Sequence, residues 1–227
     1  MSPHKHFVCF PSANPDIGNE CLKKWHAKGY DSVVMVDRQD IHVMSTIKMV
    51  GDYQRFPGYY KVINAIVGRA FVAGADLVTC IGDDMDPPRQ TAQEIADMYF
   101  KRWPDGLGVL QGCGDPQGMN QKGESASRRI CGSPTFGKGW HQKSFDGHGP
   151  FHSGFNSFYG DEILKDVSEK HGLLWMEQSI MIFHRHWSWG HGSIQPYHMA
   201  NQKSWEVDRS LYFELKERAY PGCGMLG

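Results

Sequence analysis

The residues of this 227-residue chain best suited to chemistry are three aspartates that follow a short apolar run. The run, Leu77 to Ile81, is too short and too β-branched for a helix, so it predicts a strand. Asp83, Asp84 and Asp86 come next, and a double proline then ends any ladder. These carboxylates are therefore expected at the carboxyl edge of a sheet, where open α/β sheets bind ligands.

The spacing of the aspartates suggests a divalent cation. In extended backbone, residues two apart project to the same side, so Asp84 and Asp86 are expected to face one point. Neighbouring carboxylates repel one another unless a cation or strong donors sit among them. Carboxylate oxygens suit Mg²⁺ or Mn²⁺. His184 and His186 are also two apart, after a second apolar run, so both imidazoles are expected to face one side and to reach a single centre.

Composition narrows the setting. With 24 Lys and Arg against 25 Asp and Glu, the chain has a net charge of -1, which argues against a general nucleic-acid binder. The stretch 121–145 has a local excess of basic residues, which would suit an anionic ligand. Six scattered cysteines without a Cys-x-x-Cys pair favour a reduced protein. No leader and no apolar run long enough to span a bilayer is seen, so a cytoplasmic protein is expected.

Strand and helix signals alternate along the chain, which predicts one α/β domain with a mixed, mostly parallel sheet flanked by helices. The expected strands are 6–10, 32–36, 77–81, 107–111, 129–131 and 173–183, and the expected helices 16–28, 60–73, 91–102, 161–171 and 201–218. The glycine-rich region 112–154 is predicted to be long loops, with a lid over residues 112–149.

The order of these features resembles that of glycosyltransferases of the GT-A fold, similar to family 2-like enzymes. The resemblance starts with a strand leading to Pro11-Ser12, a second strand ending in Asp37, and a helix containing Asn64. Gly82-Asp83-Asp84-Met85-Asp86 follows. Asp161-Glu162 opens a later helix, and His184-Arg185-His186 comes after a strand. The arrangement covers roughly Phe7 to Trp187.

The resemblance implies a nucleotide-sugar-binding half at 1–115 and an acceptor-binding half, with a C-terminal helix, at 116–227. Within the first half, Asp86 would bind the metal, and Asp84 the metal, its waters or the ribose, with Asp83 in support. Asp37 would contact the base or ribose. The resemblance also assigns Pro11, Ser12 and Asn64 to the nucleotide pocket.

On the acceptor side, direct displacement requires a base to take the proton of the attacking hydroxyl. Asp161 and Glu162 are the candidates, with Glu162 favoured, although family members usually have the order Glu-Asp. Acidic residues also suit a helix N-terminus because of the helix dipole alone. One of His184 and His186 would complete the metal shell. Trp140 is predicted to stack on the ligand.

The predicted function is therefore a metal-dependent glycosyltransferase that uses Mn²⁺ or Mg²⁺ and a nucleoside diphosphate sugar. The acceptor, a glycan, a lipid-linked sugar or a modified nucleic-acid base, stays open. Two alternative functions stay open. A metal-dependent hydrolase or phosphodiesterase would activate water at the aspartates and histidines. A non-catalytic sugar- or nucleotide-binding module would need none of the catalytic groups.

Overall fold

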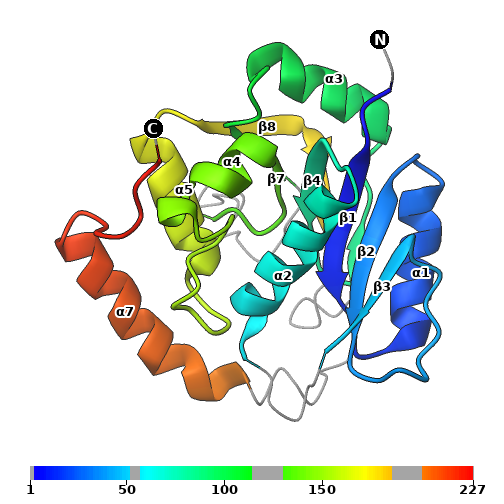
Figure 1. The fold of residues 1–227 in the computed structure, drawn as a ribbon, viewed down its shortest axis with the longest axis horizontal. Helices are drawn as coiled ribbons and strands as arrows, with labels where there is room; N and C mark the ends of the chain where they lie inside the picture. The colour runs from blue at the N-terminus through cyan, green and yellow to red at the C-terminus, as the bar shows by residue number, and fades with distance from the viewer. Residues whose placement is uncertain (1–2, 52–56, 114–129, 186–200, 227) are drawn as a thin grey trace.

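The computed structural model describes residues 3–51, 57–113, 130–185 and 201–226 (Figure 1). The chain forms one mixed α/β domain around a seven-stranded sheet with the order β3-β2-β1-β4-β7-β6-β8. The strands are β1 (His6–Pro11), β2 (Asp31–Val36), β3 (Ile47–Val50), β4 (Leu77–Cys80), β6 (Val109–Cys113), β7 (Pro134–Gly137) and β8 (Leu174–Met181). Of these, β7 runs antiparallel to its neighbours β4 and β6, and the other pairs are parallel.

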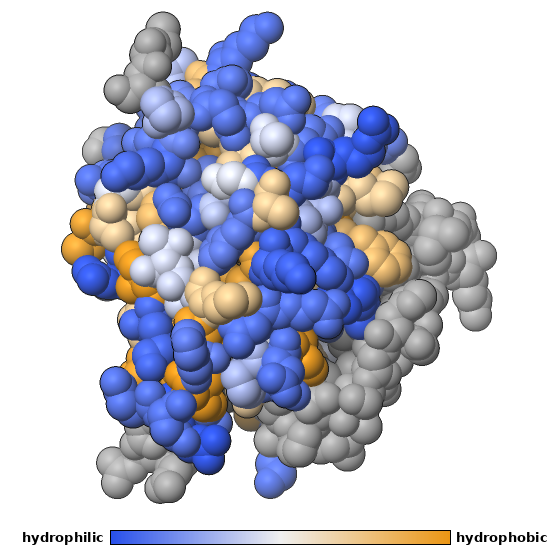
Figure 2. Space-filling model, turned by 90° about the vertical axis from the view of Figure 1, so that its right-hand side faces the viewer, coloured by the Kyte–Doolittle hydropathy of each residue, from blue (hydrophilic) through white to orange (hydrophobic). Residues whose placement is uncertain are grey.

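Helices cover both faces of this sheet. They are α1 (Pro15–His26), α2 (Tyr59–Val72), α3 (Ala92–Arg102), α4 (Lys138–Lys143), α5 (Gly160–Lys170) and α7 (Trp205–Glu217). Phe7 and Cys9 of β1 belong to the core beneath α2 and α5, whereas Val8 and Phe10 belong to the core beneath α1 and α3. Because side chains alternate along a strand and both faces are covered, the central strands are mostly apolar, and the polar side chains within them, such as His6, Thr79 and Thr135, are buried. Figure 2 views the molecule from the side of α1 and β3, and this face is mostly hydrophilic.

A second, two-stranded sheet pairs β5 (Met85–Asp86) with β9 (Phe183–His184). It joins the segment after β4 to the segment after β8, which are distant in sequence. Met85 is buried against α1, and its carbonyl accepts a hydrogen bond from Trp25 Nε1 at 2.9 Å. This two-stranded sheet, the β5–β9 ribbon, is thereby attached to α1.

Two helix starts follow from local sequence. Asn14 caps α1 by accepting from the backbone N–H groups of Asp16 and Ile17 at 3.0 and 3.3 Å. Thr91 and Glu94 form a capping box at the start of α3. Such short-range signals explain why the predicted bounds of these helices agree with the structure to within one or two residues.

The region 112–154 departs from the prediction of long loops. It contains β7 and α4, and β7 lies between β4 and β6 in the centre of the sheet. No strand forms at Cys131, and Arg129 lies outside the described residues. The segment contains too few apolar residues to mark a strand, and β7 is stabilised by pairing with strands distant in sequence. Because β7 fills the gap between β4 and β6, the two predicted halves of the chain share one sheet.

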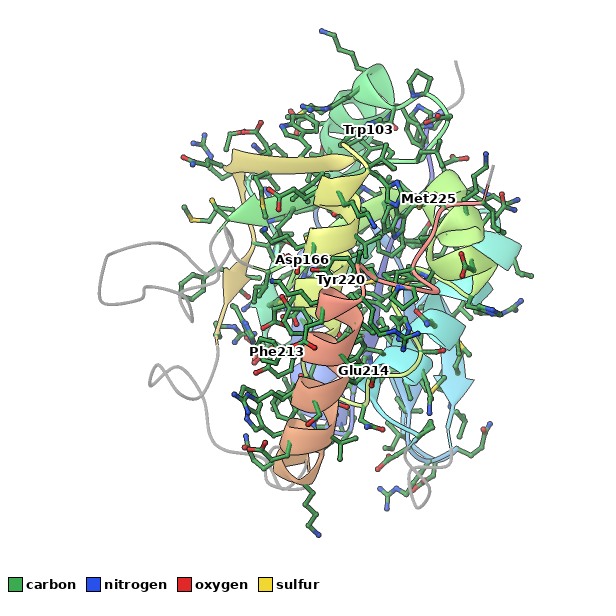
Figure 3. All side chains as sticks on the ribbon, turned by 90° about the vertical axis from the view of Figure 1, so that its left-hand side faces the viewer. Trp103, Asp166, Phe213, Glu214, Tyr220 and Met225 are labelled. Atoms are coloured by element: carbon green, nitrogen blue, oxygen red, sulfur yellow. The ribbon has the colours of Figure 1, made fainter. Side chains whose placement is uncertain are left out.

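The C-terminal helix packs on α5. Tyr212 and Leu215 of α7 are buried in the core, and Asp166 of α5 accepts hydrogen bonds from Tyr212 at 2.8 Å and from Tyr220 (Figure 3). In the described part of the chain, no helix is long and apolar enough to cross a membrane.

A buried histidine makes stability depend on pH. His6 is 1% exposed; its Nδ1 donates to the Ala92 carbonyl at 3.2 Å, and its Nε2 lies 2.8 Å from Thr79 Oγ1. Burial lowers the pKa of His6 to about 3, with the Ala92 carbonyl opposing the shift. Between the unfolded-state pKa of about 6.5 and this value, the unfolded chain binds a proton that the folded chain does not.

We therefore expect the free energy of unfolding to fall as pH falls below about 6.5, by up to about 1.4 kcal/mol per pH unit from His6 alone. Urea unfolding measured near pH 7, 6 and 5 checks this. The control is His6→Gln, whose amide can still accept from Thr79 but does not titrate. An equally steep pH dependence in the variant would contradict the assignment.

Candidate functional site

The site lies where β1, β2 and β4 end at one edge of the sheet. The chain crosses from β1 to β2 and β3 on one side and returns to β4 on the other side, so a topological switch point lies between β1 and β4. Open α/β sheets bind ligands in the crevice outside the carboxyl ends of strands at such a point. Pro11, the last residue of β1, is followed by Ser12, whose N–H donates to the Met35 carbonyl of β2 at 2.9 Å.

Ser12 connects this edge to the aspartates. It is buried, and its hydroxyl donates to Asp83 Oδ2 at 2.7 Å. Burial raises the pKa of Asp83 to about 6, the hydrogen bond from Ser12 opposes this shift, and the charge of Asp84 adds to it. Ser12 thus fixes the orientation of a carboxylate that is costly to ionise. The predicted role of Asp83 in supporting a bound metal stays a prediction.

Asp84 lies opposite His184. Its Oδ2 is 3.3 Å from His184 Nε2, and its carbonyl accepts the Arg185 N–H at 2.9 Å. This approach follows from the β5–β9 ribbon, in which Met85 is the partner of His184. A carboxylate oxygen and an imidazole nitrogen suit the same divalent ion.

Asp86 has different partners from Asp84. Its Oδ1 is 2.8 Å from Lys24 Nζ of α1 and 3.4 Å from Arg185 Nε. The two carboxylates do not share an extended segment, because Asp84 lies in the turn before β5. The prediction of one convergent metal cluster is corrected accordingly: within the described residues, no three or more His, Cys, Asp or Glu side chains are grouped to hold a metal ion. His186 lies outside those residues.

The residues present nevertheless suit a divalent ion that is held partly by its substrate. Mg²⁺ is commonly bound through one or two carboxylates together with substrate phosphates and water. Asp84 and His184 supply one oxygen and one nitrogen at the strand ends, and both side chains are partly accessible, with 29% and 13% exposed. Asp86 is less suited, since two cations already neutralise it.

Asp37 follows β2 at the same edge. Its Oδ1 is buried and has no hydrogen-bond partner among the described residues. A buried acceptor without a partner is unfavourable, so it commonly marks a place where a ligand or water donates. The predicted contact of Asp37 with a nucleoside stays a prediction.

Two predicted ligand contacts have structural roles instead. Asn64 uses both ends of its amide on the backbone of Phe151: Nδ2 donates to the carbonyl at 2.8 Å, and Oδ1 accepts the N–H at 3.1 Å. Trp140 is 0% exposed, and its Nε1 donates to the Pro150 carbonyl at 3.2 Å. The backbone of residues 150–151 thus engages both side chains, and Trp140 has no exposed surface for a ligand.

The acidic pair lies in the first turn of α5, as the helix signal predicts. Asp161 Oδ1 accepts from the Tyr60 hydroxyl at 3.3 Å and from the Glu162 N–H at 3.1 Å. Asp161 therefore stabilises the helix start and its contact with α2. Burial raises the pKa of Tyr60, and the charges of Asp161 and Glu162 add to the shift.

Tyr59 is a site residue that the sequence interpretation did not identify. It is the first residue of α2, and its hydroxyl donates to the Ile81 carbonyl at 3.5 Å. Burial raises the pKa of Tyr59, and the neighbouring Cys80, Asp161, Asp84 and Asp83 add to the shift. The start of α2 thus contacts the segment before the aspartates through Tyr59 and the acidic turn of α5 through Tyr60. The only sequence signal was a tyrosine pair at a helix start.

No family model and no curated protein matches the chain. Among solved structures, the chain is similar to the crystal structure of A197 from STIV, with 12% sequence identity and a TM-score of 0.45. The similarity covers 79% of this chain and 85% of that chain. A similarity this weak identifies neither a family nor an activity, so function has to be inferred from the site.

The partners of Asp86 predict a stabilising role. Replacing Asp86 with Asn leaves Lys24 and Arg185 with only the exposed Glu20 as a shared counter-ion, and we expect a loss of about 0.5–1.5 kcal/mol in the free energy of unfolding. Urea unfolding at low and high salt measures it. The control is Glu20→Gln, because Glu20 contacts the same two cations but is 60% exposed. Equal effects of the two variants would contradict this role.

Proposed function

We propose that the chain is a metal-dependent glycosyltransferase of the GT-A fold, which transfers a sugar from a nucleoside diphosphate sugar to an acceptor hydroxyl. One observation carries the proposal: Asp37, Asp83 and Asp84 follow the ends of β2 and β4 at the switch point, and the start of α2 contacts both this edge and the acidic turn of α5. Tyr59 reaches the Ile81 carbonyl just before the aspartates, and Tyr60 reaches Asp161. One helix start thereby connects the proposed donor site with the candidate base.

The strand ends supply the donor contacts. The buried Asp37 Oδ1 would accept a hydrogen bond from a hydroxyl or N–H of the nucleoside, which satisfies an acceptor that has no partner among the described residues. Pro11 and Ser12 form the adjoining end of β1, with Ser12 orienting Asp83. Arg185, directly after β9, lies near the same edge, because its N–H donates to the Asp84 carbonyl.

Asp84 and His184 would hold Mn²⁺ or Mg²⁺. The ion, when bound, neutralises the charge that develops on the departing diphosphate. The protein orients these two ligands by pairing β5 with β9. This differs from the sequence-based assignment, in which Asp86 was the main ligand.

Glu162 is the favoured base. Glu162 lies in the first turn of α5 beside Asp161, and it would take the proton of the attacking hydroxyl on a carboxylate oxygen. Asp161, whose Oδ1 accepts from the Tyr60 hydroxyl and the Glu162 N–H, would hold the start of this helix. The order of the seven strands, with one antiparallel strand, and the small ribbon at the strand ends support the GT-A assignment. The acceptor would be a glycan, a lipid-linked sugar or a modified nucleic-acid base.

The test is to incubate the protein with a panel of nucleoside diphosphate sugars and Mn²⁺, with and without candidate acceptors, and to measure diphosphate release and acceptor modification. Asp84→Asn is expected to weaken Mn²⁺-dependent donor binding at least tenfold, because a charged ligand is lost. Glu162→Gln is expected to keep donor affinity and lower the transfer rate by roughly 10²–10⁴-fold.

Asp86→Asn is the matched control, since it removes a neighbouring carboxylate that already pairs with cations, and it should retain Mn²⁺-dependent donor binding. If Asp86→Asn abolishes metal binding and Asp84→Asn does not, the ligand assignment is wrong. Phosphate chemistry that proceeds equally without any acceptor would favour a hydrolase, and absence of donor binding would refute the proposal.

A further inference from the structure

The C-terminal helix carries a buried carboxylate that the proposed mechanism does not use. Asp208 of α7 is 0% exposed. Its Oδ1 accepts from the backbone N–H and the side-chain amide of Asn156 at 3.0 and 2.9 Å. Its Oδ2 accepts from the N–H groups of Ser157 and Phe158 at 2.8 and 3.0 Å. Successive backbone N–H groups around one anion form a strong binding concavity, and bonds to a charged acceptor are about twice as strong as neutral ones.

The turn that Asp208 holds contacts the start of α2. The Asn156 carbonyl accepts the Tyr59 N–H, which is the first N–H of the helix. Gly58 precedes it with φ of 104°, and a Cβ there would lie only 2.8 Å from Asn156 Cα. Only glycine allows the two backbones to approach so closely. The position of Tyr59 therefore depends directly on where Asn156 lies.

The same turn leads into α5. Tyr159 has φ of 62° and is the N-cap residue, and its carbonyl accepts the Ile163 N–H at 3.0 Å. Glu162 lies in the first turn of this helix. Because only Tyr159 separates the segment held by Asp208 from α5, a shift of that segment changes the start of the helix and the direction of the Glu162 side chain.

We propose that Asp208 is a positioning residue that fixes the starts of α2 and α5 relative to each other, and so sets Tyr59 and Glu162 against the donor edge. It acts through the 156–158 turn. The inference rests on the proposed function for its effect on catalysis, but the positional effect itself does not require that any reaction takes place. The energetic basis is a buried carboxylate whose four contacts are all N–H donors.

Asp166 provides a matched control. It is also an aspartate that connects α5 with α7, through Tyr212 at 2.8 Å and Lys216 at 3.3 Å, and it contacts Tyr220 beyond the helix (Figure 3). None of its bonds reaches the 156–158 turn. Asp166→Asn therefore weakens the attachment of α7 but leaves the Asp208 carboxylate, which accepts from the N–H groups of that turn, in place.

The experiment compares Asp208→Asn with Asp166→Asn by hydrogen exchange of backbone amides and by kinetics. Asp208→Asn is expected to speed exchange at residues 156–158, Tyr59 and Ile163 by roughly tenfold or more. The reason is that an amide has one oxygen in place of two and no negative charge, so it accepts fewer and weaker hydrogen bonds from the N–H groups of the turn. Asn156→Ala, which removes one of the four bonds, is a milder second variant and should change the same amides less. With donor and acceptor, kcat should fall about 10²-fold with KM for the donor nearly unchanged, since a displaced base affects the chemical step.

Asp166→Asn should leave exchange at Tyr59 and Ile163, and kcat, close to the wild-type values. Equal changes in the two aspartate variants would overturn the proposal, as would unchanged exchange at Tyr59 and Ile163 in Asp208→Asn. If Asp208→Asn does not fold, the graded response of Asn156→Ala decides instead. If the wild-type protein transfers no sugar, the proposed function fails, while the exchange data still decide whether Asp208 positions the two helices.

Discussion

Parallel pairing of β1 with both β2 and β4 is the constraint on which the site depends. Because these strands run in one direction, the residues that follow them meet at one edge, and the helices on both faces keep the strands themselves mostly apolar. Polar residues are therefore concentrated where the strands stop. Ser12, Asp37 and Asp83 are the first polar side chains at those ends, and the hydrogen bond from Ser12 to Asp83 connects two of them.

The acidic edge is stabilised unequally. Asp86 is neutralised by Lys24 and Arg185, Asp84 lies against His184, and Asp83 relies on Ser12 and keeps a raised pKa. The burial of Asp83 beside the charge of Asp84 does not stabilise the fold, because both effects make the Asp83 carboxylate costly to ionise. Retaining unfavourable charge at a ligand-binding edge is typical of sites that a cation or a donor group completes.

The second half of the chain mainly positions the residues of the candidate site. It inserts β7 into the centre of the sheet, supplies β9 as the partner of β5, and places α7 against α5 (Figures 1 and 3). Through Asp208 and Asn156, the last helix reaches the first residue of α2. The two sides of the site are thus held by contacts between elements that are far apart in sequence, which explains why the sheet cannot be divided into independent halves.

The sequence alone determined the alternation of strands and helices and the location of the acids after β4 and at the start of α5, because periodicity, caps and strand ends are local signals. It did not reveal β7, which depends on pairing with two distant strands. Nor did it distinguish Asp86 from Asp84, since Lys24 lies 62 positions from Asp86 in the chain. Trp140 and Asn64 have side chains that suit a ligand, but tertiary packing engaged both with the backbone of residues 150–151. Only the folded structure decides which polar groups find partners inside the protein and which are left to bind something else.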